Sequence, residues 1–154
     1  MLGLGVVWLH LLAAAVFLGG LLYEGHVLAP LLARGELAPA TFREAHRRGR
    51  RATWTALALL FVTGLWNLGQ LGAALPALFQ RISGPLLAAK LFFALLVLAL
   101  AAHRDFKLVP AVLAAREAGE EPGVAGTLLR GLDRLLVLLV VAILFLGVAV
   151  SRRI

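Results

Sequence analysis

The feature that most constrains this chain is a set of four long apolar runs. They cover residues 2–33, 52–75, 85–103 and 135–150 of a 154-residue sequence that is 62% hydrophobic. A soluble domain is nearer ~45–50% apolar, whereas a helix that crosses the ~30 Å core of a bilayer needs about 20 apolar residues. The sequence therefore predicts an all-α integral membrane protein, a single domain (residues 1–154) folded as an antiparallel four-helix bundle.

The positions of the arginines and lysines predict the orientation of the bundle. The first and third linkers are rich in these residues, whereas the second carries only Arg81. Positively charged loops face the cytoplasm, so both termini are expected outside, in a multi-pass protein of the bacterial cytoplasmic membrane. Residues 41–51 and 107–118 are expected to extend the second and third spans as interfacial helices, and GEEPG at 119–123 to break the chain.

The charged residues and the first span exclude two other interpretations. The net charge of +7 lies in the linkers and forms no basic stripe on a soluble fold, so nucleic acid is not an expected partner. No arginine or lysine precedes the first apolar run, which we interpret as a retained span and not as a signal peptide. The expected partner of the surface is the lipid bilayer.

The ligand chemistry available to the chain is narrow. It has no cysteine, which excludes disulfides, thiolate metal sites and c-type haem attachment. Met1 is the only methionine, so the thioether ligands suited to copper(I) transport are missing. A bound metal would need histidine, carboxylate or tyrosine ligands, and the four histidines are the main candidates.

An outer group of polar residues is predicted from the depth of each residue in its span. His10 and Lys90 fall in the outer halves of the first and third spans, at the level of Thr63, Asn67 and Gln70 on one face of the second. Ionisable residues inside a membrane are functional by default, so His10 and Lys90 are the catalytic candidates. The structural alternatives are an interhelical hydrogen bond for His10 and snorkelling to the headgroups for Lys90.

A second group is predicted at the inner end of the bundle. His26 and His103 should lie at the same depth on different helices, as two axial ligands of one haem require. His10 lies ~24 Å of helix rise from His26 and belongs to another layer. His46 is expected to be solvated among the neighbouring arginines. The inner group comprises Tyr23, Glu24, His26, His46, Trp54, His103 and Asp105.

Three segments resemble CopD-type copper-resistance domains and the related HemJ-type protoporphyrinogen oxidases. His10, followed by FLGG at 17–20 and Tyr23, resembles the first helix of both groups. FVTGLWNLG is similar to the second helix of CopD-type domains, and GPLLAAKLFFALL resembles the opening of the third helix, with the family lysine at Lys90. The resemblance implies a four-helix membrane protein that handles copper or binds b-type haem or porphyrin, and functional roles for His10 and Lys90.

The chain departs from the HemJ-type pattern at three positions. Phe17 stands where tryptophan is expected, His26 where arginine is expected, and the histidine of the third helix is displaced to His103. Neutral imidazole ligates iron whereas arginine does not. The pattern predicts a bis-histidine haem site of His26 and His103, with Tyr23 beside it. The arginines expected to pair with the haem propionates are Arg47, Arg48, Arg51 and Arg104.

Three function classes follow. The first prediction is a b-type haem protein with a redox role, an electron carrier or a membrane oxidoreductase acting with a quinol, a porphyrin or a redox protein. His10 is then a separate haem or metal ligand. The alternative is copper uptake or delivery of the CopD type, and the third class is a structural or assembly subunit. The sequence leaves open whether the protein forms a homodimer.

Overall fold

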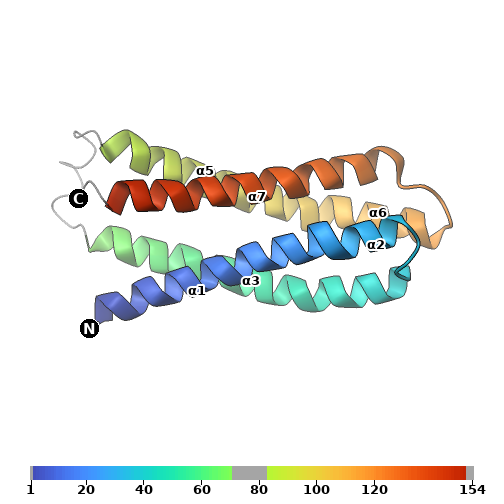
Figure 1. Ribbon diagram of the computed structural model, residues 1–154, viewed down its shortest axis with the longest axis horizontal. Helices are drawn as coiled ribbons and strands as arrows, with labels where there is room; N and C mark the ends of the chain where they lie inside the picture. Colours follow the sequence, from blue (N-terminus) through green and yellow to red (C-terminus); the bar gives the residue numbers. More distant parts are fainter. Residues whose placement is uncertain (1, 71–82, 152–154) are drawn as a thin grey trace.

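The computed structural model describes residues 2–70 and 83–151, and these residues form helices joined by short loops (Figure 1). The first span consists of α1 (Leu2–Tyr23), η1 (Glu24–Leu28) and α2 (Ala29–Ala33). The second is α3 (Pro39–Gly69), and the third consists of α5 (Ser83–His103), η2 (Arg104–Leu108) and α6 (Val109–Glu117). The fourth is α7 (Gly123–Ser151). All four are long and apolar enough to cross a membrane, which confirms the all-α membrane bundle.

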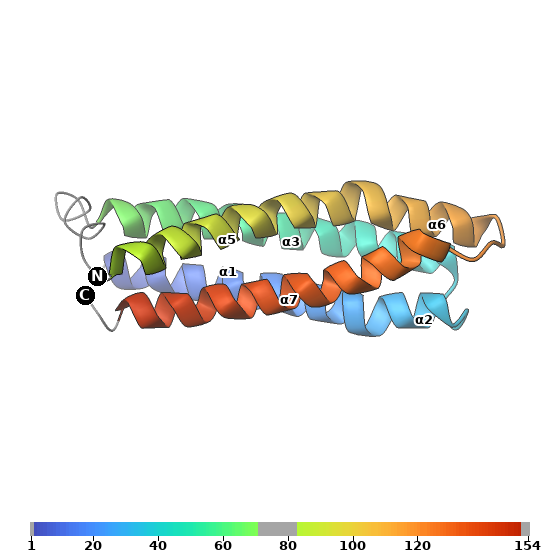
Figure 2. The same ribbon diagram turned by 90° about the horizontal axis from the view of Figure 1, so that it is seen from above.

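The four spans run side by side as two helical hairpins. The start of α1 and the end of α7 lie at one end of the bundle, and the short loops at 34–38 and 118–122 lie at the other (Figures 1 and 2). In the first hairpin α1 packs against α3, and in the second α5 packs against α7. Contacts between α1 and α7 join the hairpins. Both short loops therefore occupy the end that the arginine distribution assigns to the cytoplasm.

At the end of the bundle that carries the short loops, the helices reach beyond the apolar runs. α3 begins at Pro39, so residues 41–51 continue the second span as predicted, and η2 with α6 extends the third. The break at 119–123 is also confirmed, but α7 begins at Gly123 and not near residue 135. Residues 123–134 are more polar than the apolar run that follows them and contain no proline to break the helix. The predicted end of the second span, residues 71–75, lies outside the described residues.

The first and third spans share a local distortion of the helix. The backbone N–H of Ala29 donates to the Glu24 carbonyl, and that of Val109 donates to the Arg104 carbonyl. These are the wide turns of π-helices, which are often found at functional sites. Pro30 and Pro110 follow the two turns at equal spacing, and neither can donate to the preceding turn. Each distorted turn begins at a buried charged residue.

A polar layer divides the interior into two apolar clusters. The larger cluster contains Phe17, Leu57, Val97 and Leu136 among others, and lies toward the end that carries the start of α1. The smaller cluster lies toward the end with the short loops and contains Leu28, Leu32, Phe42, Leu108, Val109, Val112, Leu113 and Leu129. In every span the buried charged or histidine residue falls between the two clusters in the sequence. Many other large apolar side chains along the spans are exposed, as is expected of side chains that face lipid.

Candidate functional site

The centre of the polar layer is Arg104, whose side chain is only 3% exposed. Its Nε donates to Asp133 Oδ1 at 2.5 Å, and its Nη1 donates to Asp105 Oδ1 at 2.6 Å. Its Nη2 donates to Glu24 Oε1 at 2.9 Å. The three carboxylates come from η1, η2 and α7 and are themselves buried. One guanidinium therefore ties three spans together through charge-assisted hydrogen bonds.

The second span completes the cluster with two ring nitrogens. His46 Nδ1 lies 2.7 Å from Glu24 Oε1, and Trp54 Nε1 donates to Asp105 Oδ2 at 2.9 Å. All four spans thus contribute to one buried cluster, which we call the charge cluster. Its members are Glu24, His46, Trp54, Arg104, Asp105 and Asp133.

The prediction that His46 is solvated is wrong. His46 is only 6% exposed, and its ring stacks on the ring of Phe42, with the two centroids 6.2 Å apart. The two residues are four apart and share the inward face of α3, whereas Arg47, Arg48 and Arg51 lie on its exposed faces. The basic composition of the segment concealed this amphipathic pattern.

The charge cluster is incompletely balanced. It opposes three carboxylates with one arginine, and within the described chain His46 Nε2 and Asp133 Oδ2 are buried without a hydrogen-bond partner. A cavity of about 10 Å³, lined in part by Arg50 and Arg104, adjoins it and has the space of about one water molecule. Arg50 also lies over the ring of Phe106, at 5.4 Å from its centroid.

Close approach of the first and fourth spans depends on Gly25. A Cβ at this position would lie 3.0 Å from both Cβ and Cγ of Asp133. Real Cβ atoms rarely come so near to a neighbour, and the shift needed would move Asp133 away from Arg104. The absence of a side chain at Gly25 therefore allows Asp133 to reach Arg104.

His10 forms a separate site in the half of the bundle that carries the start of α1 and the end of α7. Its Nδ1 lies 2.7 Å from Thr63 Oγ1, and this hydroxyl donates to the Leu59 carbonyl at 2.6 Å. A threonine hydroxyl has one hydrogen, and that hydrogen is used on Leu59. The imidazole nitrogen must then be the donor to Thr63, so Nδ1 carries the proton and Nε2 of the neutral ring presents a lone pair.

Lys90 lies beside this outer site. It is close enough to His10 for a charge on either residue to affect the other, and its Nζ would lie 3.2 Å from a Cβ added at Gly147. No carboxylate pairs with Lys90 in the segments 2–70 and 83–151. The predicted neighbours Asn67 and Gln70 have no hydrogen bond to His10 in those segments. The structure thus brings together His10, Thr63 and Lys90.

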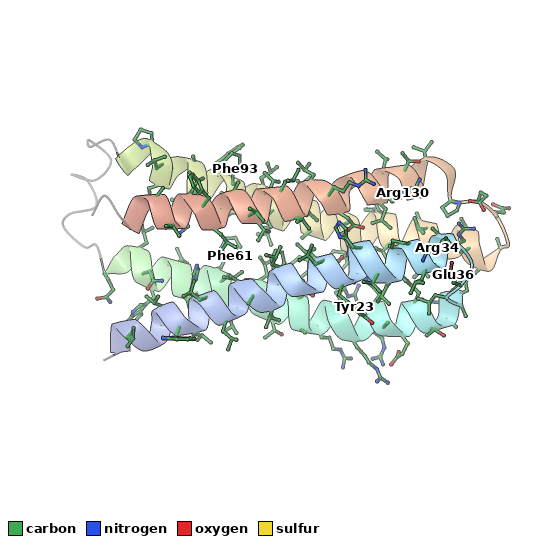
Figure 3. The ribbon with its side chains drawn as sticks, viewed as in Figure 1. Tyr23, Arg34, Glu36, Phe61, Phe93 and Arg130 are labelled. Carbon is green, nitrogen blue, oxygen red and sulfur yellow. The ribbon has the colours of Figure 1, made fainter. Side chains whose placement is uncertain are left out.

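The residues predicted to hold haem are not gathered into one site. His26, His103 and Arg51 are exposed, and Tyr23, labelled in Figure 3, is 58% exposed. Arg47 pairs with Glu44 at 2.7 Å. No ring contact or hydrogen bond joins the two histidines, and no group of three or more metal-ligating side chains occurs, in the described part of the chain. The bis-histidine haem site stays a prediction.

The surroundings of Arg104 differ from those expected of an arginine that pairs with a haem propionate. All three of its nitrogens are already engaged by carboxylates of the protein. The sequence prediction placed Glu24, His46, Trp54 and Asp105 at the inner end but assigned none of them to Arg104, and it omitted Asp133. The signal that was available is the shared spacing of Glu24 to Pro30 and of Arg104 to Pro110.

A comparison with protein-family models gives a match. The family model described as copper resistance protein D matches residues 43–151, which is well over half of the chain. The match includes most of the charge cluster and Lys90, and it begins after His10 and Glu24. No curated protein and no solved structure matches the chain. The CopD-type resemblance is therefore confirmed, and the HemJ-type resemblance stays a prediction.

Proposed function

This chain belongs to the copper resistance protein D family, and from that premise we propose that it handles copper ions in the bacterial cytoplasmic membrane. His10 is the proposed ligand, in the outer half of the bundle. The copper ion is the cargo of the protein, bound and passed on, and not a resident cofactor. This function corresponds to the copper alternative predicted from the sequence.

The observation that carries the proposal is the hydrogen bond from His10 Nδ1 to Thr63. Histidines that ligate a metal usually donate their other N–H to a neighbouring acceptor, which fixes the orientation of the ring and its tautomer. Thr63 has this role for His10, and the lone pair of Nε2 is left for the metal. The backbone of Gly64 lies next to the ring, since a Cβ at this position would be in ordinary van der Waals contact with His10 Cε1, at 3.6 Å.

The other three histidines are less suited to an exchangeable metal. His46 is buried and committed to Glu24. His26 and His103 are exposed, and neither ring has an orienting hydrogen bond within residues 2–70 and 83–151. His10 alone combines partial exposure with a fixed tautomer.

Binding at His10 is expected to be weak and reversible. Imidazole suits copper, but the chain offers no thiolate and, apart from Met1, no thioether. The positive charge of Lys90 repels a bound cation. A weak site with open coordination positions allows the ion to pass to another carrier, which suits delivery better than storage.

The packing of the interior argues for delivery at the outer side and against an open channel. Residues 10 and 24 are ~21 Å apart along the first span. Between these levels the bundle is filled by apolar side chains, and Phe17 and Leu136 are at most 1% exposed. No continuous polar path joins His10 to the charge cluster in the described residues.

Copper binding by the detergent-purified protein tests this proposal. Equilibrium dialysis with copper, followed by metal analysis, compares the wild type with His10→Gln and His103→Ala. Glutamine keeps an N–H donor for Thr63 and removes the imidazole ligand, so it separates loss of copper from loss of fold. Wild type and His103→Ala should bind copper in an equimolar amount, and His10→Gln should not. Equal binding by all three proteins would refute the role of His10.

The visible absorption spectrum of the same samples tests the haem interpretation. A Soret band that disappears in His26→Ala or His103→Ala, with no copper bound, would overturn the proposed function. A folded protein that binds neither copper nor haem would favour the structural or assembly class, in which His10 and Lys90 only join helices.

A further inference from the structure

A second cavity lies at the end of the bundle that carries the short loops. It has a volume of about 170 Å³ and is lined by residues of α2, α3, α6, α7 and the loop before α7. A cavity of ~150 Å³ accommodates a benzene-sized group, so this one has room for a small chemical group. Neither the copper proposal nor the charge cluster involves this cavity.

The walls of the cavity are apolar and its polar side chains are mainly cationic. Leu32, Phe42, Val112 and Leu129 supply apolar surface, and Arg116 and Arg130 supply the positive charges. Glu121 is the acidic residue of the lining. Its side chain is 83% exposed and pairs with Arg116 Nη1 at 2.9 Å, so one of the two cationic charges is left unbalanced.

Arg116 is held in place with one donor unused. Its Nη2 donates to the Ala33 carbonyl at 2.8 Å, which connects α6 to the end of the first span. Its Nε is buried and has no hydrogen-bond partner among the described residues. A buried N–H without an acceptor is costly, so the guanidinium that lines the cavity keeps unused hydrogen-bonding capacity.

Arg130 is the more available of the two arginines. It is exposed, and its Nη1 lies 4.0 Å from the position of a Cβ on Gly126, beside the cavity. Its one hydrogen bond in the described chain is a long contact of 3.3 Å from Nη2 to Thr127 Oγ1, and no carboxylate pairs with it there. Figure 3 shows Arg130 on α7 near the short loops.

The start of α7 adds to the positive field. Gly123 and Gly126, in the first turn of this 29-residue helix, line the cavity, and that turn contains no acidic residue. The first N–H groups of a helix lack intrahelical acceptors and favour an anion. Arg116, Arg130 and the start of α7 therefore act on the same space.

We propose that this cavity binds the phosphate headgroup of an acidic phospholipid from the cytoplasmic leaflet. The two arginines and the helix start bind the phosphate, and the apolar walls contact the acyl chains. Basic pockets between helices on the cytoplasmic side have this lipid chemistry. The apolar walls and the position at the cytoplasmic end favour a lipid over a free phosphate ion. The proposal is independent of copper binding.

Thermal unfolding of the detergent-purified protein tests the proposal with defined probes. Unfolding is followed during titration with phosphatidylglycerol, with phosphatidylcholine, and with inorganic phosphate at constant ionic strength. Arg130→Gln is the test variant. Arg134→Gln is the matched control, because it removes the same charge from the same exposed side of the chain one turn further along α7, outside the cavity.

Phosphatidylglycerol should stabilise the wild type and the Arg134→Gln control, and phosphatidylcholine should not. Loss of a charge-assisted hydrogen bond in Arg130→Gln should raise the apparent dissociation constant for phosphatidylglycerol about tenfold. Equal stabilisation by inorganic phosphate would show that the site takes the free anion and would refute the lipid. Equal effects of the two substitutions, or no effect of phosphatidylglycerol, would refute the site.

Discussion

Replacement of Arg104 by methionine should be among the most destabilising single changes in the described bundle. Methionine is close to arginine in length but has no charge and no donor, so the change leaves Glu24, Asp105 and Asp133 buried without their shared cation. The three carboxylates now hydrogen-bond to Arg104 at 2.5–2.9 Å from three different spans. Their mutual repulsion would act in an environment that screens charge poorly.

The expected loss follows from the burial of the network. Removing one partner of a buried ion pair typically costs ~3–5 kcal/mol, and three pairs share Arg104, although part of the loss is relieved by protonation of a carboxylate. A protein domain is stable by only ~5–15 kcal/mol. For a chain of this length the corresponding fall in melting temperature is on the order of 10 °C.

Thermal melting in detergent, followed by tryptophan fluorescence, measures this loss. Trp54 donates to Asp105 and reports directly on the charge cluster. The control is Arg48→Gln, which removes an exposed arginine paired with Glu44 and should melt close to the wild type. Asp133→Asn should cost less in the Arg104→Met background than alone, because the two groups are coupled. If Arg104→Met melted at the same temperature as Arg48→Gln, the charge cluster would not stabilise the fold.

Three further predictions concern single positions. Gly25→Ala should lower stability by about 1–3 kcal/mol, whereas Gly19→Ala, with no neighbour within 4 Å, should not; equal melting temperatures would contradict the close approach to Asp133. Thr63→Val should weaken copper binding at least ~10-fold, because His10 would lose the acceptor that fixes its tautomer. The change of tautomer should be visible in the nitrogen NMR shifts of the His10 ring. An unchanged spectrum would contradict the assigned tautomer. Lys90→Met should tighten copper binding in equilibrium dialysis, and weaker binding would show that Lys90 assists the ion.

The fold was predictable because it depends on long, simple patterns. Four apolar runs and the arginine-rich linkers predict the spans and place the two short loops at the same end. The ends of the helices were harder to predict, because polar segments such as residues 123–134 are helical without being apolar. Helix continuation there depends on packing of one face, which includes Leu129 and Leu132, against the smaller apolar cluster and not on burial in lipid.

The sites were predictable only in part. His10 and Lys90 were assigned to one outer layer because an ionisable residue deep in a span is conspicuous, and the structure brings them together. The charge cluster was missed as a unit because side-chain pairing depends on which faces turn inward at the two π-turns. Asp133 looked like a loop charge, and His46 looked like one more solvated residue of a basic helix.

X-ray absorption spectroscopy at the copper edge, on copper-loaded protein, tests the central claim most directly. Our account predicts imidazole scattering around the copper in the wild type and in His103→Ala, and its loss in His10→Gln. Imidazole scattering that persists in His10→Gln and disappears in His103→Ala or His26→Ala would contradict the account and move the metal site to the inner end of the bundle.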